Sequence, residues 1–530
     1  MDKPWLKQYP AGVPADIDAS QYRSLAHLLE DSFQKNRNRR AFECMGKVLT
    51  YGEIDTYSRQ LAAWLQSRGL APGARVALMM PNVLQYPVAL AAVLRAGYVV
   101  VNVNPLYTPR ELEHQLKDSG AEAIIILENF ATTLQQVLPN TPVKHIVVAS
   151  MGDMLGGLKG MLVNFVVRSV KKMVPAWELP SCIRFNTALE EGAKLALKPT
   201  SVGPDDVAFL QYTGGTTGKS KGAIRRHRST AAAVIATSSD FEFPAVPRYL
   251  AAAPITHVSG TKVLPSLMRG GEIHLLKGFE PEKFLTTIER EKINCTLMVP
   301  TMIYVALDHP RLDQIDLSSL ELLLYGASPM SPSRLVEGLE RIGPVFSQLY
   351  GQTECYPVSV LRKGDHDAKR PHLFASCGFP LSSCLVSLRD PDNNEVAPGA
   401  AGEICVRAPH AMERYWKRPE QTEDTFKGGW LHTGDIARAD EQGYLYIVDR
   451  SKDMIVSGGF NIFPREVEDV LTSHPDVAMA AVIGVPHEKW GEAVTALVVA
   501  KQGASIDAES LMQLVKDRKG STHAPKQVEF

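Results

Sequence analysis

The chain has 530 residues, which is long for a single domain and enough to bury several hydrophobic cores. Its 57 basic and 58 acidic residues nearly cancel, which argues against a nucleic-acid-binding protein. The seven cysteines form no Cys-x-x-Cys pair, the start does not resemble a signal peptide, and no apolar run reaches membrane-spanning length. We therefore expect a cytoplasmic protein without a disulfide framework.

The N-terminal part alternates helical and strand patterns. Apolar spacing predicts helices over 51–69, 86–96 and 110–119, and short apolar runs predict strands over 75–80, 99–103, 123–127 and 145–148. Such alternation favours a parallel sheet covered by helices. It does not specify a function, because many activities use this kind of sheet.

The segment 154–177 has a different character. Its charges are all basic, and Leu162, Phe165, Val166 and Met173 can share one helical face. An interfacial helix on an anionic bilayer has this pattern. A surface helix packed on its own domain has it too, so both interpretations stay open.

A loop rich in glycine, threonine and lysine runs from Tyr212 to Gly222, after a predicted buried strand over 207–211 and before a helix rich in alanine. Backbone N–H groups, hydroxyls and lysines in such a loop can surround a phosphate. A Walker phosphate loop needs a glycine five places before Gly218, but Thr213 stands there. Two other interpretations of this loop are the phosphate loop of a P-loop phosphohydrolase, against which the spacing argues, and a flexible linker.

Three later strands end beside polar or small residues. The first leads to His257, the second to Gly326, Ala327 and Ser328, and the third to the hydroxyl and carboxylate of Thr353-Glu354. Small residues admit a flat ligand near backbone, and the hydroxyl and carboxylate pair suits Mg²⁺ beside phosphate. Taken singly, a histidine beside an apolar strand is usually a packed residue and a lone glutamate usually a surface acid.

From residue 402 onward the pattern is antiparallel, with strands over 430–436 and 443–450 joined by a hairpin turn. The last eighty or so residues predict helices over 466–473 and 506–516 and strands over 477–483 and 494–499. The fold class is thus α/β: a large domain of helix-covered sheets with a β-rich subdomain, 1–449, and a small α+β domain, 450–530.

Four ordered motifs carry a resemblance that covers essentially the whole chain. They are Tyr-Thr-Gly-Gly-Thr-Thr-Gly-x-x-Lys-Gly at 212–222, Tyr-Gly-Gln-Thr-Glu at 350–354, Thr-Gly-Asp at 433–435 and Asp-Arg-x-Lys-Asp at 449–453. With them, the chain resembles an acyl-CoA synthetase of the adenylate-forming superfamily. The first half is most similar to long-chain fatty-acid ligases, whereas the part after Ala223 is closer to ligases of shorter or aromatic acids.

The resemblance implies an ATP-dependent activation of a fatty or related acid to an acyl-adenylate, followed by transfer to coenzyme A. The attacking carboxylate and the triphosphate are both anionic, so cationic donors and Mg²⁺ must offset their repulsion. The implied site residues are Thr213, Gly214, Gly215, Thr216, Thr217, Gly218 and Lys221 on the phosphates; Glu354 with Thr213 at Mg²⁺; Thr353 on the α-phosphate; Gly326, Ala327, Ser328, Tyr350 and Gly351 around adenine; Asp435 and Arg450 on the ribose; and His257 by the acyl carboxylate.

The resemblance also implies that the small domain is mobile. It would rotate about Lys452 between the two half-reactions and bring Gly458 and Gly459 to the thiol tunnel. An interface rebuilt twice per turnover has to be only marginally stable in each state.

One departure concerns the C-terminus. The family continues past the match to Ala524-Pro525-Lys526 into a Pro-x-x-x-x-Gly-Lys segment, and the chain given ends at Phe530 before it. The missing lysine grips the α-phosphate in the family, and losing such a contact costs on the order of 10²–10³ in rate. We therefore keep a nucleotide or acyl-adenylate binding protein, impaired in adenylation, as an alternative. Lys526 does not fill the missing role.

The expected partners are small molecules, namely the acid, ATP and coenzyme A. Peripheral contact with the inner face of a membrane through 154–177 and a homodimer are the two further associations considered. Acyl length and class stay open, because pocket size depends on distances between side chains that the sequence does not give.

Overall fold

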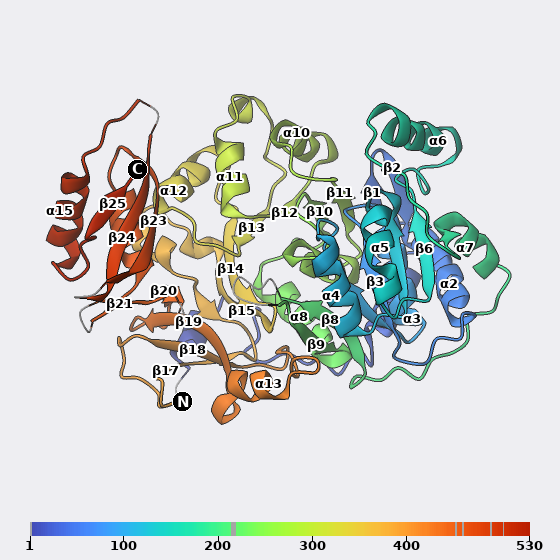
Figure 1. Ribbon diagram of the computed structural model, residues 1–530, viewed down its shortest axis with the longest axis horizontal. Coiled ribbons are helices and arrows are strands. Elements are labelled where there is room, and N and C mark those ends of the chain that lie inside the picture. The colour runs from blue at the N-terminus through green and yellow to red at the C-terminus, as the bar shows by residue number, and fades with distance from the viewer. Residues whose placement is uncertain (1–2, 214–218, 451–452, 458–459, 488–489, 502) are drawn as a thin grey trace.

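The computed structural model describes residues 3–213, 219–450, 453–457, 460–487, 490–501 and 503–530. Within these ranges the strands form four sheets. The C-terminal sheet with its helices lies at one end of the molecule, and the N-terminal sheets form the broad body (Figure 1). The predicted α/β fold, with a large and a small part, is confirmed.

One sheet of the body follows the order β7-β6-β5-β3-β4-β8-β9, and its neighbours are parallel except for the last pair. Its central strands consist mainly of buried apolar residues, with the polar Arg75 and Asn102 at strand ends, as expected for a sheet with helices on both faces. The bounds are β3 (Arg75–Met79), β4 (Val99–Asn102), β5 (Ala123–Leu127), β6 (His145–Ala149), β7 (Ile183–Arg184), β8 (Val207–Tyr212) and β9 (Gly222–Arg226).

The second sheet of the body has the order β16-β15-β14-β13-β12-β10-β11-β1-β2, parallel in the middle and antiparallel at both edges. Strands from the start of the chain thus pair with strands more than 200 residues later, as Phe42 with Ile273. The bounds are β1 (Arg40–Cys44), β2 (Lys47–Thr50), β10 (Arg248–Ala251), β11 (Glu272–Leu275), β12 (Cys295–Met298), β13 (Leu322–Gly326), β14 (Phe346–Gln352), β15 (Cys355–Leu361) and β16 (Phe379–Pro380).

Helices cover both sheets. Helix α2 begins with a capping box, in which Thr50 Oγ1 accepts from the Glu53 N–H and Glu53 accepts from the Thr50 N–H, and it packs on α3 and α7. The bounds are α1 (Leu25–Lys35), α2 (Tyr51–Gln66), α3 (Gln85–Arg95), α4 (Pro109–Ser119), α5 (Ala131–Val137), α6 (Gly157–Phe165), α7 (Phe185–Gly192), α8 (His227–Asp240), α9 (Val263–Met268), α10 (Pro281–Glu291), α11 (Pro300–Leu307), α12 (Pro332–Arg341) and α13 (Pro419–Thr425).

Two smaller sheets complete the molecule. One is antiparallel, β17 (Leu385–Arg389), β18 (Gly402–Arg407), β19 (Leu431–Ala439) and β20 (Leu445–Arg450), as the sequence predicts for this region. The other contains β21 (Ile455–Ser457), β22 (Phe460–Ile462), β23 (Val477–His487), β24 (Gly491–Ala500) and β25 (Gln527–Glu529), with α14 (Pro464–Thr472) and α15 (Ala508–Lys519). It has its own core, which includes Val467, Leu471, Val494 and Leu511.

Two local expectations are wrong. The central loop does not lead directly into a helix, because Gly222–Arg226 forms β9, antiparallel to β8, before α8 begins. The loop therefore connects β8 and β9, the two strands of a β-hairpin. The segment 154–177 is helical only over Gly157–Phe165, followed by a π-helical turn at Val166–Val170, and Pro175 lies beyond both.

All seven cysteines are free, and all but Cys182 are buried. Burial raises the pKa of the buried thiols, for Cys44, Cys355, Cys377 and Cys405 to about 12. Along the described part of the chain, every helix is too short or too polar to cross a bilayer.

Candidate functional site

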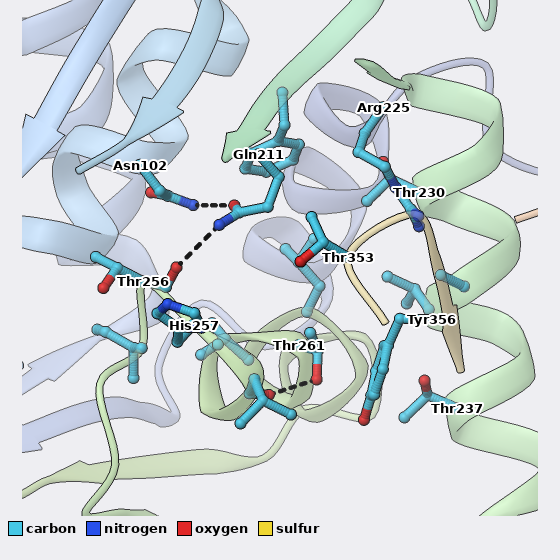
Figure 2. A pocket seen from close by; sticks show the side chains of 18 of the residues that line it. Asn102, Gln211, Arg225, Thr230, Thr237, Thr256, His257, Thr261, Thr353 and Tyr356 are labelled. Carbon is cyan, nitrogen blue, oxygen red and sulfur yellow. Dashed lines mark hydrogen bonds between the residues drawn. The ribbon is translucent and has the colours of Figure 1, made fainter. Parts of the chain in front are cut away.

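A cavity of about 310 Å³ lies where the two large sheets meet. Its walls come from α3, β4, β8, β9 and α8, from the segment after β10, and from the β14–β15 hairpin. Four predicted site residues line it, namely His257, Ala327, Gly351 and Thr353. Figure 2 shows His257 and Thr353 reaching this space from different elements. The structure thus unites residues that are up to about a hundred positions apart in the sequence.

A chain of hydrogen bonds forms the wall beside His257. Tyr86 Oη donates to Asn102 Oδ1 at 2.8 Å. Asn102 Nδ2 in turn donates to Gln211 Oε1 at 3.0 Å, and Gln211 Nε2 donates to the Thr256 carbonyl at 3.4 Å (Figure 2). These polar groups satisfy one another's hydrogen-bonding capacity, and the network holds the backbone next to His257 in place. The cavity walls partly desolvate the imidazole and lower the pKa of His257, which favours its neutral form.

Tyr415 connects two predicted phosphate-side residues. Its hydroxyl donates a short hydrogen bond to Glu354 Oε1, and Lys221 Nζ lies 4.1 Å from the centre of its ring. The Lys221 carbonyl accepts from the Thr213 N–H at 2.9 Å, so Thr213 sits at the same end of the hairpin. Glu354 Oε2 has no hydrogen-bond partner among the described residues. A carboxylate oxygen and a nearby hydroxyl fit the ligand preference of Mg²⁺.

Tyr350, Asp435 and Arg450 come together as a second group. Tyr350 Oη donates to Asp435 Oδ2 at 2.6 Å, and Arg450 Nε lies 3.5 Å from Asp435 Oδ1. Asp435 and Arg450 face each other across β19 and β20. Burial and the Asp435 carboxylate raise the pKa of the Tyr350 hydroxyl, which stays a donor.

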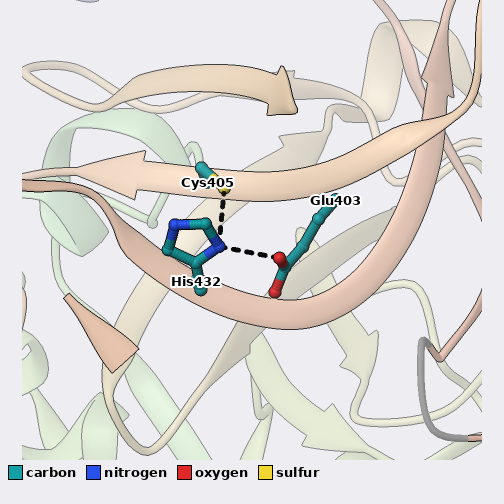
Figure 3. A group of neighbouring side chains, drawn as sticks. All are labelled: Glu403, Cys405 and His432. Atoms are coloured by element: carbon teal, nitrogen blue, oxygen red, sulfur yellow. Dashed lines mark hydrogen bonds and ion pairs between the residues drawn. The ribbon is translucent and has the colours of Figure 1, made fainter. Parts of the chain in front are cut away.

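The strand that carries Asp435 is fixed by Glu403 on β18 (Figure 3). Glu403 Oε1 accepts from the Gly434 N–H at 2.7 Å, and Oε2 accepts from His432 Nδ1 at 2.7 Å. Cys405 Sγ lies 3.4 Å from the same Nδ1. One ligand atom from each of these three side chains lies within 4.8 Å of the others, a spacing that a metal ion would also accept. The hydrogen bonds of Glu403 account for the arrangement, and we assign it a structural role.

Some predicted residues lie elsewhere. Gly326 is buried in β13, where an added Cβ would stand 2.2 Å from the Leu349 carbonyl oxygen, so it serves close strand packing. Ser328 is exposed and is not among the residues that line the cavity. The predictions for Gly214, Gly215, Thr216, Thr217, Gly218, Lys452, Gly458 and Gly459 fall outside the described residues.

Sequence reasoning missed several residues of the site: Tyr415, Glu403, Tyr356 and Arg225. Tyr415 and Glu403 act through partners that lie far from them in the sequence, and nothing in their local pattern marks them. The sequence itself shows Arg225 as a basic residue just after the central loop. Its placement in β9 turns it into the cavity, and the missed strand explains why it was overlooked.

Comparison with known proteins gives consistent matches. The model of the AMP-binding enzyme family matches residues 29–416, and that of the AMP-binding enzyme C-terminal domain matches 466–530. The chain is 43% identical to a long-chain-fatty-acid–CoA ligase of Escherichia coli O157:H7 and 44% identical to one of Salmonella typhimurium, each match covering all of this chain and 95% of the relative. The solved structure of the amide bond synthetase McbA from Marinactinospora thermotolerans is 30% identical, with a TM-score of 0.83 and 95% of each chain covered.

Proposed function

Because this chain belongs to the AMP-binding enzyme family, we propose that it is an AMP-forming acid–CoA ligase that acts on fatty acids. ATP activates the acid as an acyl-adenylate with release of pyrophosphate, and coenzyme A then displaces AMP. The observation that carries this function is one cavity lined by His257 and Thr353, with Glu354 the next residue in the chain. The cavity supplies an apolar space for an acyl chain, next to side chains that suit the binding of phosphate and a metal ion.

Adenylation brings two anions together, and the residues near Tyr415 suit that task. Lys221 supplies positive charge and Glu354, with Thr213, supplies oxygen ligands for Mg²⁺. When bound there, Mg²⁺ would neutralise part of the negative charge on the phosphates. Tyr415 orients the Glu354 carboxylate, and the neutral His257 offers a hydrogen bond to the acyl carboxylate. Thr353 and the central loop would stabilise the negative charge that develops on the α-phosphate.

We assign Asp435 to the ribose hydroxyls, with Tyr350 and Arg450 fixing its carboxylate and Glu403 fixing its strand. Ala327 and Gly351 line the cavity, which supports their place near adenine. The position of Tyr350 beside adenine stays a prediction. So do the hinge at Lys452, the approach of Gly458 and Gly459 to the thiol, and the domain boundary between residues 449 and 450.

An acid-dependent ATP–pyrophosphate exchange assay tests the first half-reaction. We expect exchange with hexanoate or palmitate and acyl-CoA formation when coenzyme A is added. Release of phosphate in place of pyrophosphate would identify a phosphohydrolase. Nucleotide binding without exchange, and without thioester formation from a synthetic acyl-adenylate, would identify a binding protein.

We also propose that α6 and the turn after it bind an anionic membrane surface. Leu158, Met161, Leu162 and Phe165 are exposed by 84%, 63%, 63% and 59%. The helix lies at the edge of the body in Figure 1, and the exposed Lys171 and Lys172 follow it. Exposed apolar side chains next to lysines are the pattern of an interfacial helix.

Flotation with vesicles of phosphatidylcholine, with or without phosphatidylglycerol, measures this contact. The double variant Leu158→Ser and Phe165→Ser should bind anionic vesicles about 10-fold more weakly, because the inserted apolar area is lost. Val305→Ser removes an exposed apolar residue on α11 and serves as the control. Equal binding by the double variant and the wild type would contradict the proposal. Light scattering on the protein alone tests whether it forms the homodimer considered above.

A further inference from the structure

A buried lysine lies directly behind the wall of the cavity. Lys262 is 0% exposed, although its neighbours in the chain, Thr261 and Val263, both line the cavity. Lys262 Nζ donates a short hydrogen bond to Tyr356 Oη, and Tyr356 lines the cavity too. Burial lowers the pKa of the Lys262 amine well below its ordinary value. A buried amine is costly unless it is hydrogen-bonded, so Tyr356 is the partner that permits this burial.

The pair of Lys262 and Tyr356 lies where the cavity ends along α8. Thr237 is the last residue of α8 that lines the cavity, and Phe241, one turn further along the chain, is fully buried. Lys262 Nζ lies 5.1 Å from the centre of the Phe241 ring. In Figure 2 the Tyr356 hydroxyl points to the side of the view where Thr237 lies, away from Arg225. The packed interior around Phe241 and Lys262 thus begins where the cavity stops.

The reacting end of the acid lies elsewhere in the cavity. The proposed ligase function, on which this inference rests, places the acyl carboxylate at His257 and the α-phosphate at Thr353. The acyl chain has to extend away from the phosphates, and apolar lining residues such as Leu264 offer it contact. The Tyr356 ring, held from behind by Lys262, is where the space for that chain ends.

We propose that Lys262 is a positioning residue for Tyr356, and that the pair closes the acyl space and sets the longest fatty acid that the enzyme activates. An unpaired tyrosine ring could turn aside for a longer chain, but the hydrogen bond holds the Tyr356 hydroxyl in place. The buried Phe241 in turn leaves Lys262 no room to withdraw. The cavity of about 310 Å³ is at the lower end of the range for ligand pockets, roughly 300–1,000 Å³, so we expect a limit among ordinary fatty acids.

The test measures kcat/KM in the exchange assay for saturated acids of six to eighteen carbons. Up to the limit, each added CH₂ should raise kcat/KM about 4-fold, because it is buried in the cavity. The next acid should fall at least about 10-fold, because a packed end does not admit further carbons. Lys262→Ala removes the support behind Tyr356 and should move the limit by at least about two carbons, with kcat/KM for hexanoate and KM for ATP changed less than about 3-fold.

Two further variants break the same hydrogen bond with less change in volume. Lys262→Met keeps a long unbranched side chain but leaves the Tyr356 hydroxyl without its donor, and it should shift the limit in the same direction if the alanine variant does not fold. Tyr356→Phe should act alike, and the double variant should add little, because both changes remove one interaction. Lys283→Ala, on the exposed surface of α10, is the control and should leave the limit unchanged.

The wild type alone can overturn the proposal, if kcat/KM rises through the whole series without a limit. A limit that stays at the same length in Lys262→Ala and Lys262→Met would overturn it too. If these variants lose activity by the same factor with every acid and unfold at a lower temperature, Lys262 serves the fold alone and the proposal is wrong. Absence of exchange with any acid in the wild type would instead refute the ligase function itself.

Discussion

At the scale of single residues, hydrogen-bond partners hold the carboxylates of the site in one orientation. Tyr415 fixes Glu354 by a hydrogen bond, and Tyr350 fixes Asp435 in the same way. In both pairs a phenol donates to a carboxylate that is assigned to nucleotide binding. The carboxylates are thereby oriented before ATP arrives, which lowers the cost of ordering them on binding.

Replacing Glu354 tests the metal assignment. In Glu354→Gln the amide oxygen can still accept from Tyr415, so the fold should persist while the negative charge is lost. We expect the exchange rate to fall by roughly 10²-fold or more, with a higher Mg²⁺ concentration needed for half-maximal activity. Glu423→Gln, an exposed change on α13, is the control. A Glu354→Gln enzyme with full activity would refute the role of this carboxylate at the metal.

At the scale of elements, neighbouring strands position the segment that is proposed to bind the ribose. Glu403 on β18 accepts from the Gly434 N–H on β19, directly before Asp435, and Thr433 donates to the Ile404 carbonyl at 2.8 Å. The strands shift register at this point, between Glu403 and Cys405. A side chain from β18 thus replaces regular backbone pairing directly before Asp435, the residue proposed to bind the ribose.

Glu403→Ala should loosen this segment. Because Gly434 loses its acceptor, we expect KM for ATP to rise about 10-fold, equivalent to ~1.4 kcal/mol, with kcat changed less. Glu403→Gln keeps an acceptor and should have an intermediate effect. Cys405→Ala removes a neighbour that does not contact Gly434 and is the control. Should KM for ATP stay constant in Glu403→Ala, the positioning role would be wrong.

The elements were more predictable than the site. Strand β5 is an uninterrupted apolar run, and β3 is one after its first residue, Arg75; burial on both faces requires that pattern. Strand β9 was missed because it carries Arg225 and Arg226, which locally resemble a loop. The partners of Glu354 and Gly434, which are Tyr415 and Glu403, could not be predicted, because they reach the site only through the packing of distant parts of the chain.

At the scale of the whole molecule, buried histidines make stability depend on pH. Burial lowers the pKa of His227, His366 and His410 to about 4. His227 Nδ1, for example, accepts from the Leu25 N–H at 3.1 Å and has to be neutral to do so. Between pH 4 and the unfolded value of 6.5, the unfolded chain binds more protons than the folded one.

The free energy of unfolding should therefore fall as pH decreases from 6.5 toward 4, by at most about 1.4 kcal/mol per pH unit for each of these groups. Burial raises the pKa of Asp240 to about 6, which opposes the trend in part. Urea unfolding midpoints across this range measure the effect. His227→Asn should flatten the pH dependence, His372→Asn on the exposed surface should not, and a midpoint that rises on acidification would contradict the prediction.

The arrangement of the cysteines has a practical consequence. Six thiols are buried and Cys182 alone is partly accessible, so Cys182→Ser would leave a background that reacts slowly with maleimides. A dye pair could then be attached to one cysteine introduced on α12 and another on α15. Energy transfer between the dyes, recorded during turnover, would test whether the C-terminal sheet moves relative to the body of the enzyme, as the proposed hinge requires.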